Sequence, residues 1–144
     1  MIGTGAAGST AAFQCRSSGW NVAIIDFEAI RGTCALRGCG PKKVLVGAAE
    51  LRDRILRMDG KGMSLSSAEI DWPALIRFKR TFTDPVPQNR ENGFSEAGIR
   101  PFHGRARFLD RDTLQVGDDI LTARHIVIAA GAMPAIWVFP ANSI

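Results

Sequence analysis

The chain has 144 residues, of which 46% are hydrophobic and 22% charged, with a net charge of +4. This length suits one domain, and the composition can build a buried core. No apolar run approaches the length needed to cross a bilayer, no basic residue precedes the apolar stretch at residues 6–13, and the positive charges are scattered. We therefore predict a cytoplasmic protein whose partners include neither a membrane nor a nucleic acid.

A glycine-rich loop at residues 3–8 has the G-x-G-x-x-G pattern and opens a small-residue helix predicted over residues 9–16. Gly3 would make the tight turn, Gly5 would let a diphosphate approach the backbone, and Gly8 would let the helix pack closely on a strand. The simpler interpretation is an ordinary turn. On its own the pattern is weakly diagnostic.

The next segment strengthens the prediction of a nucleotide site. Residues 21–26 predict a buried parallel strand that ends in Asp26, at the distance from the loop expected of a ribose-binding acid. Its carboxylate could accept hydrogen bonds from both ribose hydroxyls, although a solvated strand-end carboxylate is the simpler alternative. The order of glycine loop, strand and acid favours an adenosine diphosphate group with a free ribose 2′-OH, and therefore FAD or NAD rather than NADP.

Two cysteines, Cys34 and Cys39, follow at a predicted helix start. On a regular helix their Cα atoms would lie about 8.6 Å apart, whereas a disulfide needs less than about 7 Å, so a bent entry is required. Three glycines, at positions 32, 38 and 40, supply the freedom for it. Pro41 suits the first turn of the helix that would follow.

Cys39 would then lie near a helix N-terminus, where the helix dipole, Lys42 and Lys43 favour a thiolate. We interpret the pair as a redox dithiol. The alternatives are two buried reduced thiols, a structural disulfide, or half of a zinc site. Zinc would need further ligands, and Cys15, His103 and His125 show no second pair at ligand spacing. We predict no metal.

The rest of the chain alternates helices and strands. We predict a helix over residues 41–58 that ends at two glycines and carries an inward apolar stripe made of Val44, Leu45, Ala48, Leu51, Ile55 and Met58. A second helix begins at Asp71, breaks at residues 84–87 and resumes to Ala97, with Gly98 as its C-cap, and its basic cluster at residues 77–80 forms a solvated face. Strands are predicted at residues 105–109, 114–116 and 125–129, with a turn at 117–119, which gives a three-layer α/β fold.

These motifs, in this order, resemble the pyridine nucleotide–disulfide oxidoreductase family. The resemblance rests on the glycine loop, on Asp26, on the Gly-Thr-Cys-x4-Cys-x-Pro-Lys-Lys run at residues 32–43, and on two later segments. Residues 126–134 resemble the family's second flavin motif, with Ala130 in place of a threonine. Residues 104–108 resemble the stretch that passes the adenine. The resemblance implies a Rossmann-like FAD-binding domain.

The resemblance also implies roles for individual residues. Cys39 would lie against the flavin, Cys34 would exchange with substrate, and Lys42 or Lys43 would lie near the flavin N5. Electrons would pass from NAD(P)H through FAD to the Cys34–Cys39 disulfide and on to a small-molecule disulfide or similar substrate such as glutathione, lipoamide or mercuric ion, in a homodimer. The implied FAD contacts are Gly3, Gly5, Ala6, Ala7, Gly8, Asp26, Gly32, Thr33, Lys42, Lys43, Ala106, Ala130 and Gly131.

Two departures from the family pattern set the expected domain organisation. Only Met1 and Ile2 precede the glycine loop, and the chain is about a third of the family's length. We therefore expect an FAD-binding domain truncated at both ends, over residues 1–134, and an apolar tail at 135–144, without nicotinamide and dimerisation domains. His103 and His125 match no catalytic motif. The isolated chain should lack turnover, and the alternative function is a non-catalytic nucleotide-binding fragment or an interaction module.

Overall fold

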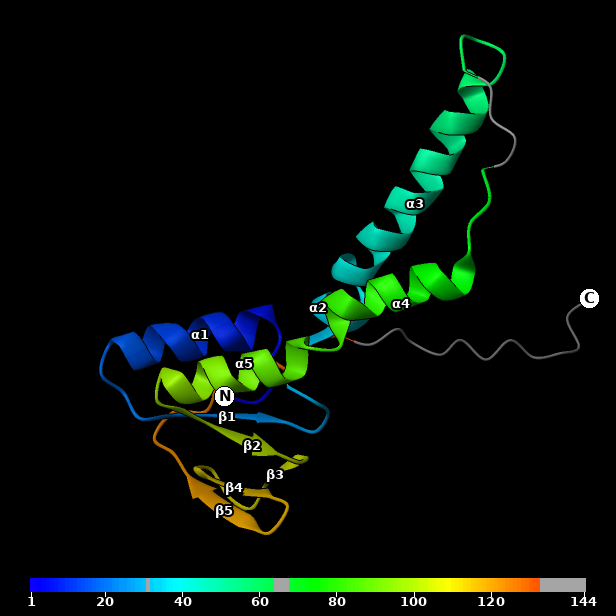
Figure 1. Cartoon of the computed structure of the whole chain (residues 1–144). Helices are drawn as coiled ribbons and strands as arrows, with labels where there is room; N and C mark the ends of the chain where they lie inside the picture. Colours follow the sequence, from blue (N-terminus) through cyan, green and yellow to red (C-terminus); the bar gives the residue numbers. More distant parts are fainter. Residues whose placement is uncertain (31, 64–67, 133–144) are drawn as a thin grey trace, which may run out of the picture.

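The computed structural model of the chain describes residues 1–30, 32–63 and 68–132, in which helices alternate with strands (Figure 1). The helices are α1 (Ala6–Ser17), α2 (Gly32–Arg37), α3 (Cys39–Met58), α4 (Trp72–Thr83) and α5 (Val86–Glu96). The strands are β1 (Val22–Asp26), β2 (Ile99–His103), β3 (Ala106–Phe108), β4 (Thr113–Val116) and β5 (Asp119–Thr122). The tail predicted at residues 135–144 lies outside the described residues.

The parallel sheet at the centre of the fold confirms one predicted strand and adds one that the sequence did not predict. β1 matches the predicted strand, and it pairs in parallel with β2 along its whole length. We did not predict β2, which contains Pro101, a residue with no N–H to donate to a sheet. Among the described strands β2 pairs only with β1. The proline is tolerated there because an edge strand can turn that position outward without losing a bond.

Residues 1–3 form a short central segment on the other side of β1, to which backbone hydrogen bonds of 2.8 and 2.9 Å join them; its Ile2 makes isolated bridges rather than a strand. Beyond this segment lies the strand predicted at residues 125–129. It is reduced to a single parallel bridge between Ile2 and Ile128. The predicted length was wrong because a ladder needs successive partners, and the short central segment offers only one.

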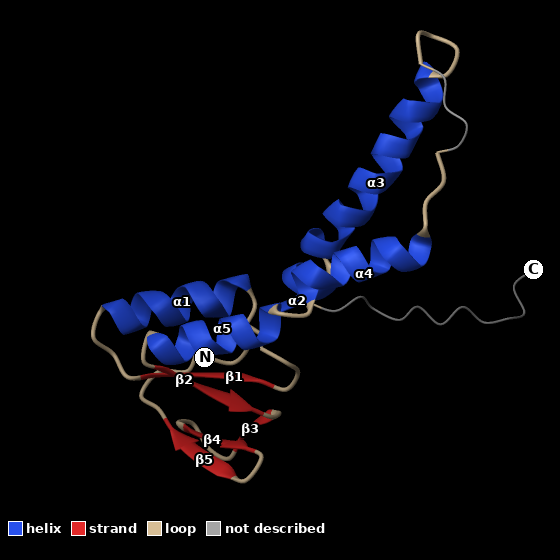
Figure 2. Cartoon of the chain, in the orientation of Figure 1, coloured by secondary structure: helices blue, strands red, loops and turns tan. Residues whose placement is uncertain are grey.

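Two further layers cover the sheet (Figure 2). The helices α1 and α5 cover one face over a core made of Ala12, Val22, Ile24, Ile30, Phe94 and Ile99. The antiparallel sheet β3–β4–β5 packs on the other face through Ile25, Leu114 and Val116. Gly117, with a φ of +60°, makes the predicted turn, and it leads into β5, which was not predicted. The expected three-layer Rossmann-like α/β fold is confirmed.

Helix ends follow the predicted signals closely. The Asp71 carboxylate accepts a hydrogen bond of 3.0 Å from the Ala74 N–H, which satisfies one of the open donors in the first turn of α4. The predicted break separates α4 from α5, and Gly98, with a φ of +74°, follows the end of α5. The capping signals thus predicted the start of α4 and the end of α5, whereas α5 begins at Val86, inside the predicted break.

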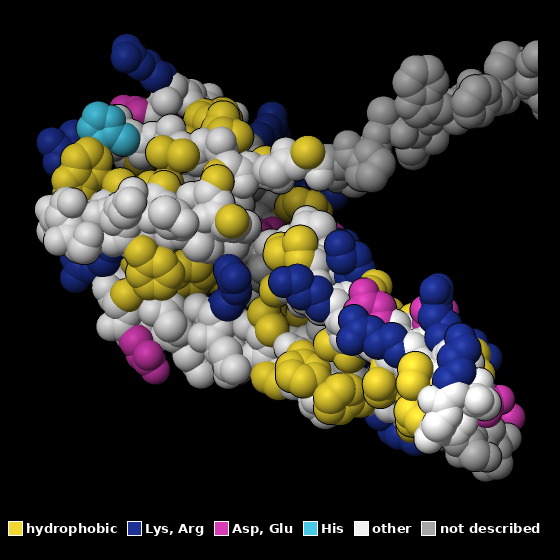
Figure 3. Space-filling model, turned by 90° about the horizontal axis from the view of Figure 1, so that it is seen from above, with side chains coloured by type: hydrophobic (Ala, Val, Ile, Leu, Met, Phe, Trp, Pro, Cys, Tyr) yellow, Lys and Arg dark blue, Asp and Glu magenta, His cyan; other side chains and the backbone are white. Residues whose placement is uncertain are grey.

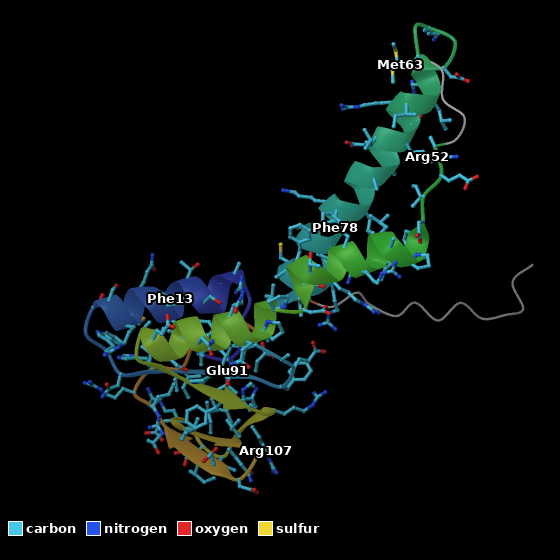
Figure 4. All side chains as sticks on the ribbon, in the orientation of Figure 1. Phe13, Arg52, Met63, Phe78, Glu91 and Arg107 are labelled. Atoms are coloured by element: carbon cyan, nitrogen blue, oxygen red, sulfur yellow. The ribbon has the colours of Figure 1, made fainter. Side chains whose placement is uncertain are left out.

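The helices α3 and α4 project from the sheet as an arm, on which hydrophobic side chains share the surface with Lys and Arg (Figures 1 and 3). The predicted inward stripe of α3 is only partly covered: Leu51 is 61% exposed and Met58 43%. That prediction was wrong because, within the described chain, α3 packs mainly against the two helices α2 and α4. On α4, Phe78 (labelled in Figure 4) and Phe82 are also exposed, with their rings edge to face at 5.1 Å.

Candidate functional site: a glycine loop beside a dithiol

The glycine loop has the close contacts that its three glycines predict. Gly3 has a φ of +105°, and a Cβ placed there would lie 2.2 Å from the Ala129 carbonyl oxygen. A Cβ at Gly8 would lie 2.0 Å from the Gly3 carbonyl oxygen. Neither position can carry a side chain without moving backbone, so the tight turn and the close packing of α1 on the central segment are confirmed.

The N-terminus of α1 is open to an anion. Gly5 is the N-cap and provides no side-chain hydrogen bond, and the first turn contains no acidic residue. Ala6 and Ala7 are exposed. Nearby, the Arg90 guanidinium donates to the Ser9 hydroxyl over 3.4 Å, which adds positive charge to the positive end of the helix dipole. This geometry suits a pyrophosphate.

Asp26 has a structural role that the sequence did not reveal. One carboxylate oxygen accepts hydrogen bonds from the hydroxyl and the N–H of Thr4, the latter over 3.1 Å, and the other accepts from the Glu28 N–H over 3.2 Å. Thr4 is fully buried. The acid thus ties the end of β1 to the glycine loop. A carboxylate has about four lone-pair sites, so it retains capacity for a ribose hydroxyl.

The segment with the cysteines touches the glycine loop directly. Gly32 has a φ of +61°, and a Cβ there would lie 2.6 Å from the Cα of Gly5. Only two glycines allow the backbones to approach so closely. Thr33, the next residue, is exposed at the start of α2. The dithiol is therefore held beside the predicted pyrophosphate site by contact between two backbones.

The predicted bend between the two cysteines is confirmed. α2 ends at Arg37, Gly38 interrupts the helix, and Cys39 is the first residue of α3. A Cβ at Gly38 would lie 3.1 Å from the Cα of Cys34, so the bend is closely packed. The cysteines lie on two helices rather than on one, as the disulfide geometry required.

The two thiols of the dithiol are accessible, and the structure shows an interaction between them. Cys34 and Cys39 are both free and exposed, so the alternative of buried thiols is wrong. The sequence predicts a stabilised thiolate at Cys39, which stays a prediction, and the structure adds a lowered pKa for the Cys34 thiol. The causes are hydrogen bonds from the side chain and then the backbone N–H of Cys39, with a smaller contribution from the charge of Lys43. A hydrogen bond to the charged form stabilises a thiolate.

The two later segments also reach the loop. The Gly104 N–H donates to the Asp26 carbonyl over 2.8 Å, which places Ala106, at the start of β3, near the end of β1. Ala130 lies next to Gly3, since a Cβ at Gly3 would come 3.2 Å from the Ala130 nitrogen. Gly131, with a φ of +78°, follows. The last two residues of the proposed second flavin motif lie outside the described residues.

The remaining residues considered in the sequence analysis are two lysines and two histidines. Lys42 and Lys43 are exposed in the first turn of α3. His103 ends β2, with its Nε2 3.0 Å from a carboxylate oxygen of Glu91 (labelled in Figure 4), and His125 packs against Trp20 outside the strands. In residues 1–30, 32–63 and 68–132, no three His, Cys, Asp or Glu side chains form a metal-binding group. No helix there has both the length and the apolar character of a membrane span.

The fold and the contacts of the loop define an α/β protein with a glycine loop of the dinucleotide-binding type and a pair of cysteines beside that loop. Comparison with known proteins identifies the family: residues 1–143 match the pyridine nucleotide-disulphide oxidoreductases, and the chain belongs to that family. This confirms the resemblance on which the sequence prediction rested.

Individual relatives agree. The chain is 32% identical over 134 residues to a glutathione reductase of Nostoc sp., covering 93% of this chain and 29% of the relative. It is 29% identical to a mercuric reductase of Staphylococcus aureus, covering 97% and 26%. Among solved structures, the HOCl-induced flavoprotein disulfide reductase RclA from Escherichia coli matches with a TM-score of 0.78 and 25% identity, over 96% of this chain and 29% of that one. The chain thus spans less than a third of each relative.

Proposed function

We propose that residues 1–134 form the FAD-binding and dithiol-bearing part of a flavoprotein disulfide oxidoreductase. The observation that carries this proposal is the contact between Gly5 and Gly32, which joins the loop expected to bind a pyrophosphate to the segment that bears the cysteines. A nucleotide on the loop would extend along the same face as the thiols. The family of the chain and the relatives named as disulfide, glutathione and mercuric reductases support the same conclusion.

The residues present fit FAD. The backbone N–H groups of Ala6, Ala7 and Gly8 would hold its pyrophosphate, Asp26 would accept from its ribose, and the backbone near Ala106 would pass its adenine. Gly32 and Thr33 would lie beside the middle part of the FAD. The isoalloxazine ring of the FAD would lie near Ala130, Gly131, Lys42 and Lys43. When bound, FAD would relay two electrons from NAD(P)H to the disulfide form of the dithiol.

The dithiol would then perform the exchange chemistry. The Cys34 thiolate attacks one sulfur of an external disulfide, which forms a mixed disulfide and releases the first substrate thiolate. The Cys39 thiolate next attacks the Cys34 sulfur, which forms the Cys34–Cys39 disulfide and releases the second. The dithiol is oxidised by two electrons and the substrate disulfide is reduced by two. The lowered pKa of Cys34 favours the first attack.

A second candidate is nucleotide binding without turnover, in which the dithiol exchanges no electrons with the flavin. For a complete protein of this kind we propose a homodimer in the cytoplasm that acts on a small-molecule disulfide. Both candidates bind a dinucleotide, and they differ in whether the dithiol communicates with the flavin.

One absorption experiment separates these candidates. The purified chain is titrated with FAD and then reduced with a mild dithiol. We expect a bound-flavin spectrum and, after reduction, a long-wavelength band from a thiolate in contact with the flavin. The band should vanish in Cys39→Ser and persist in Cys34→Ser, while both variants still bind FAD. Bound flavin without the band would support nucleotide binding without turnover, and an absence of bound flavin would contradict the proposal for this chain.

A further inference from the structure

The short helix α2, which bears Cys34, lies where the arm meets the layers of the sheet (Figure 1). It has six residues, none of which is buried, and within the described chain it packs mainly against α3. A helix this short has little stability of its own. The contact between Gly32 and Gly5 holds its beginning. The position of its other end, at Arg37, therefore depends on contacts outside the core.

An ion pair holds the end of α2. The Arg37 guanidinium donates two hydrogen bonds to the Glu28 carboxylate, of 2.6 and 3.3 Å, one to each oxygen. A bidentate pair of this kind fixes direction as well as distance. Both side chains are partly exposed, so the pair adds little to the overall stability of the fold. Its main contribution is therefore the geometry that it imposes on α2.

The Glu28 end of this pair belongs to the segment that follows β1. The Glu28 N–H donates to the Asp26 carboxylate over 3.2 Å. Two residues further along the chain, Ile30 is only 1% exposed and lies in the core beneath α1 and α5. Glu28 is thus held between the end of a strand and a core residue, and it offers Arg37 a fixed partner.

The bend that follows Arg37 decides which groups reach the Cys34 thiol. The groups that lower its pKa all lie on α3: the side chain and the N–H of Cys39, then the N–H of Gly40, and last the charge of Lys43. Cys34 precedes the bend and these groups follow it. The hydrogen bonds therefore persist only while α2 and α3 keep their relative orientation.

From these contacts we infer that Glu28 and Arg37 are a positioning pair for the dithiol, which holds the end of α2 so that the Cys34 sulfur stays at the N-terminus of α3. The inference rests on the proposed function, since it concerns the thiol that would attack the substrate disulfide. The pair acts through the backbone bend, and it links the reactivity of Cys34 to the segment that carries Asp26.

The charge of Arg37 offers a second way for it to act, which the test has to separate from positioning. Arg37 follows Cys34 by three residues on one helix, so the two side chains share a face. If the positive charge acted directly on the thiolate, Glu28 would weaken the effect by neutralising it. Removal of the Glu28 charge would then lower the pH at which Cys34 is alkylated, whereas loss of positioning would raise it.

The test measures the rate of Cys34 alkylation against pH in the complete chain, with mass spectrometry to distinguish the cysteines. In both Glu28→Gln and Arg37→Gln, the pH of half-maximal rate should rise by about one unit, the shift expected when a charged group loses one hydrogen bond. Glu28→Arg combined with Arg37→Glu exchanges the charges, restores the pair and should reverse the shift. The matched control is Asp53→Asn, which removes an exposed ion pair of 2.8 Å with Arg57 within α3 and should leave this pH unchanged.

A second readout is the mixed disulfide formed during exchange. With oxidised glutathione as the probe, the Cys34 thiolate binds one glutathione and releases the other as a thiolate. The Cys39 thiolate then attacks the Cys34 sulfur, which forms the Cys34–Cys39 disulfide and releases the bound glutathione. This second step needs close approach of the two sulfur atoms. We expect acid-quenched samples of either single variant to contain at least about tenfold more mixed disulfide than the wild-type chain, and the charge-exchanged variant to match the wild-type chain.

A lower alkylation pH in Glu28→Gln would overturn the inference, because it would show that Arg37 acts through its charge. Unchanged values in both single variants would also overturn it, as would a charge-exchanged variant that behaves like the single ones. The thiol measurements need no FAD. A failure of the chain to bind flavin would therefore contradict the proposed function and leave the positioning pair standing.

Discussion

Replacement of Gly32 with alanine tests the contact that joins the dithiol to the glycine loop. The new Cβ would lie 2.6 Å from the Cα of Gly5, at a residue whose φ is +61°. The left-handed backbone costs about 1–2 kcal/mol for a residue with a Cβ, and the clash with backbone costs about 1–3 kcal/mol more. We expect the free energy of unfolding, measured with urea, to fall by about 2–5 kcal/mol, the sum of these two contributions.

Gly60→Ala provides the matched control. Gly60 has a φ of +71°, but nothing lies within 4 Å of a Cβ placed there. This variant carries the backbone cost alone, so we expect a loss of about 1–2 kcal/mol. FAD affinity should fall in the Gly32 variant and remain unchanged in the control. Equal losses of stability in the two variants would refute the claim that the Gly5–Gly32 contact is tight.

Further predictions concern the thiols, Asp26 and a helix cap. In Cys39→Ala, the pH at which Cys34 is alkylated at half its maximal rate should rise, because the hydrogen bond that stabilises its thiolate is lost; an unchanged pH would show that Cys39 does not lower the pKa. Asp26→Asn should cost about 1–3 kcal/mol of unfolding free energy, since it weakens the bonds to Thr4. Combining it with Thr4→Val should cost less than the sum of the single changes, and full additivity would argue against the bond. Asp71→Ala should lower the same free energy by about 1 kcal/mol through loss of the α4 cap, without changing FAD affinity.

Much of the site was predictable because its chemistry is local. Glycines at positions 3 and 8 were assigned to a tight turn and a close packing, and the structure gives both. The break between Cys34 and Cys39 followed from a comparison of helix geometry with disulfide geometry. These inferences depend on the covalent structure of single residues, such as the missing Cβ of glycine, which can be read from the sequence without knowing the fold.

The errors arose where distant parts of the chain decide the outcome. The contact between Thr4 and Asp26 spans 22 positions, and nothing in the local sequence of Thr4 indicated it. β2 was missed because its proline is acceptable only at a sheet edge, and the order of the strands is a tertiary property. The exposed stripe of α3 could not be predicted either, since apolar spacing shows which side chains share a face but not what covers that face.

The break at Gly38 has a mechanical consequence. α3 has 20 residues and begins at Cys39, so it extends about 30 Å from the dithiol to its far end. A rotation of about 10° at the break would displace that end by about 5 Å over this length. Cys34 and Cys39 lie on either side of this break. Any rotation of the backbone between the two thiols would therefore be carried along the whole arm.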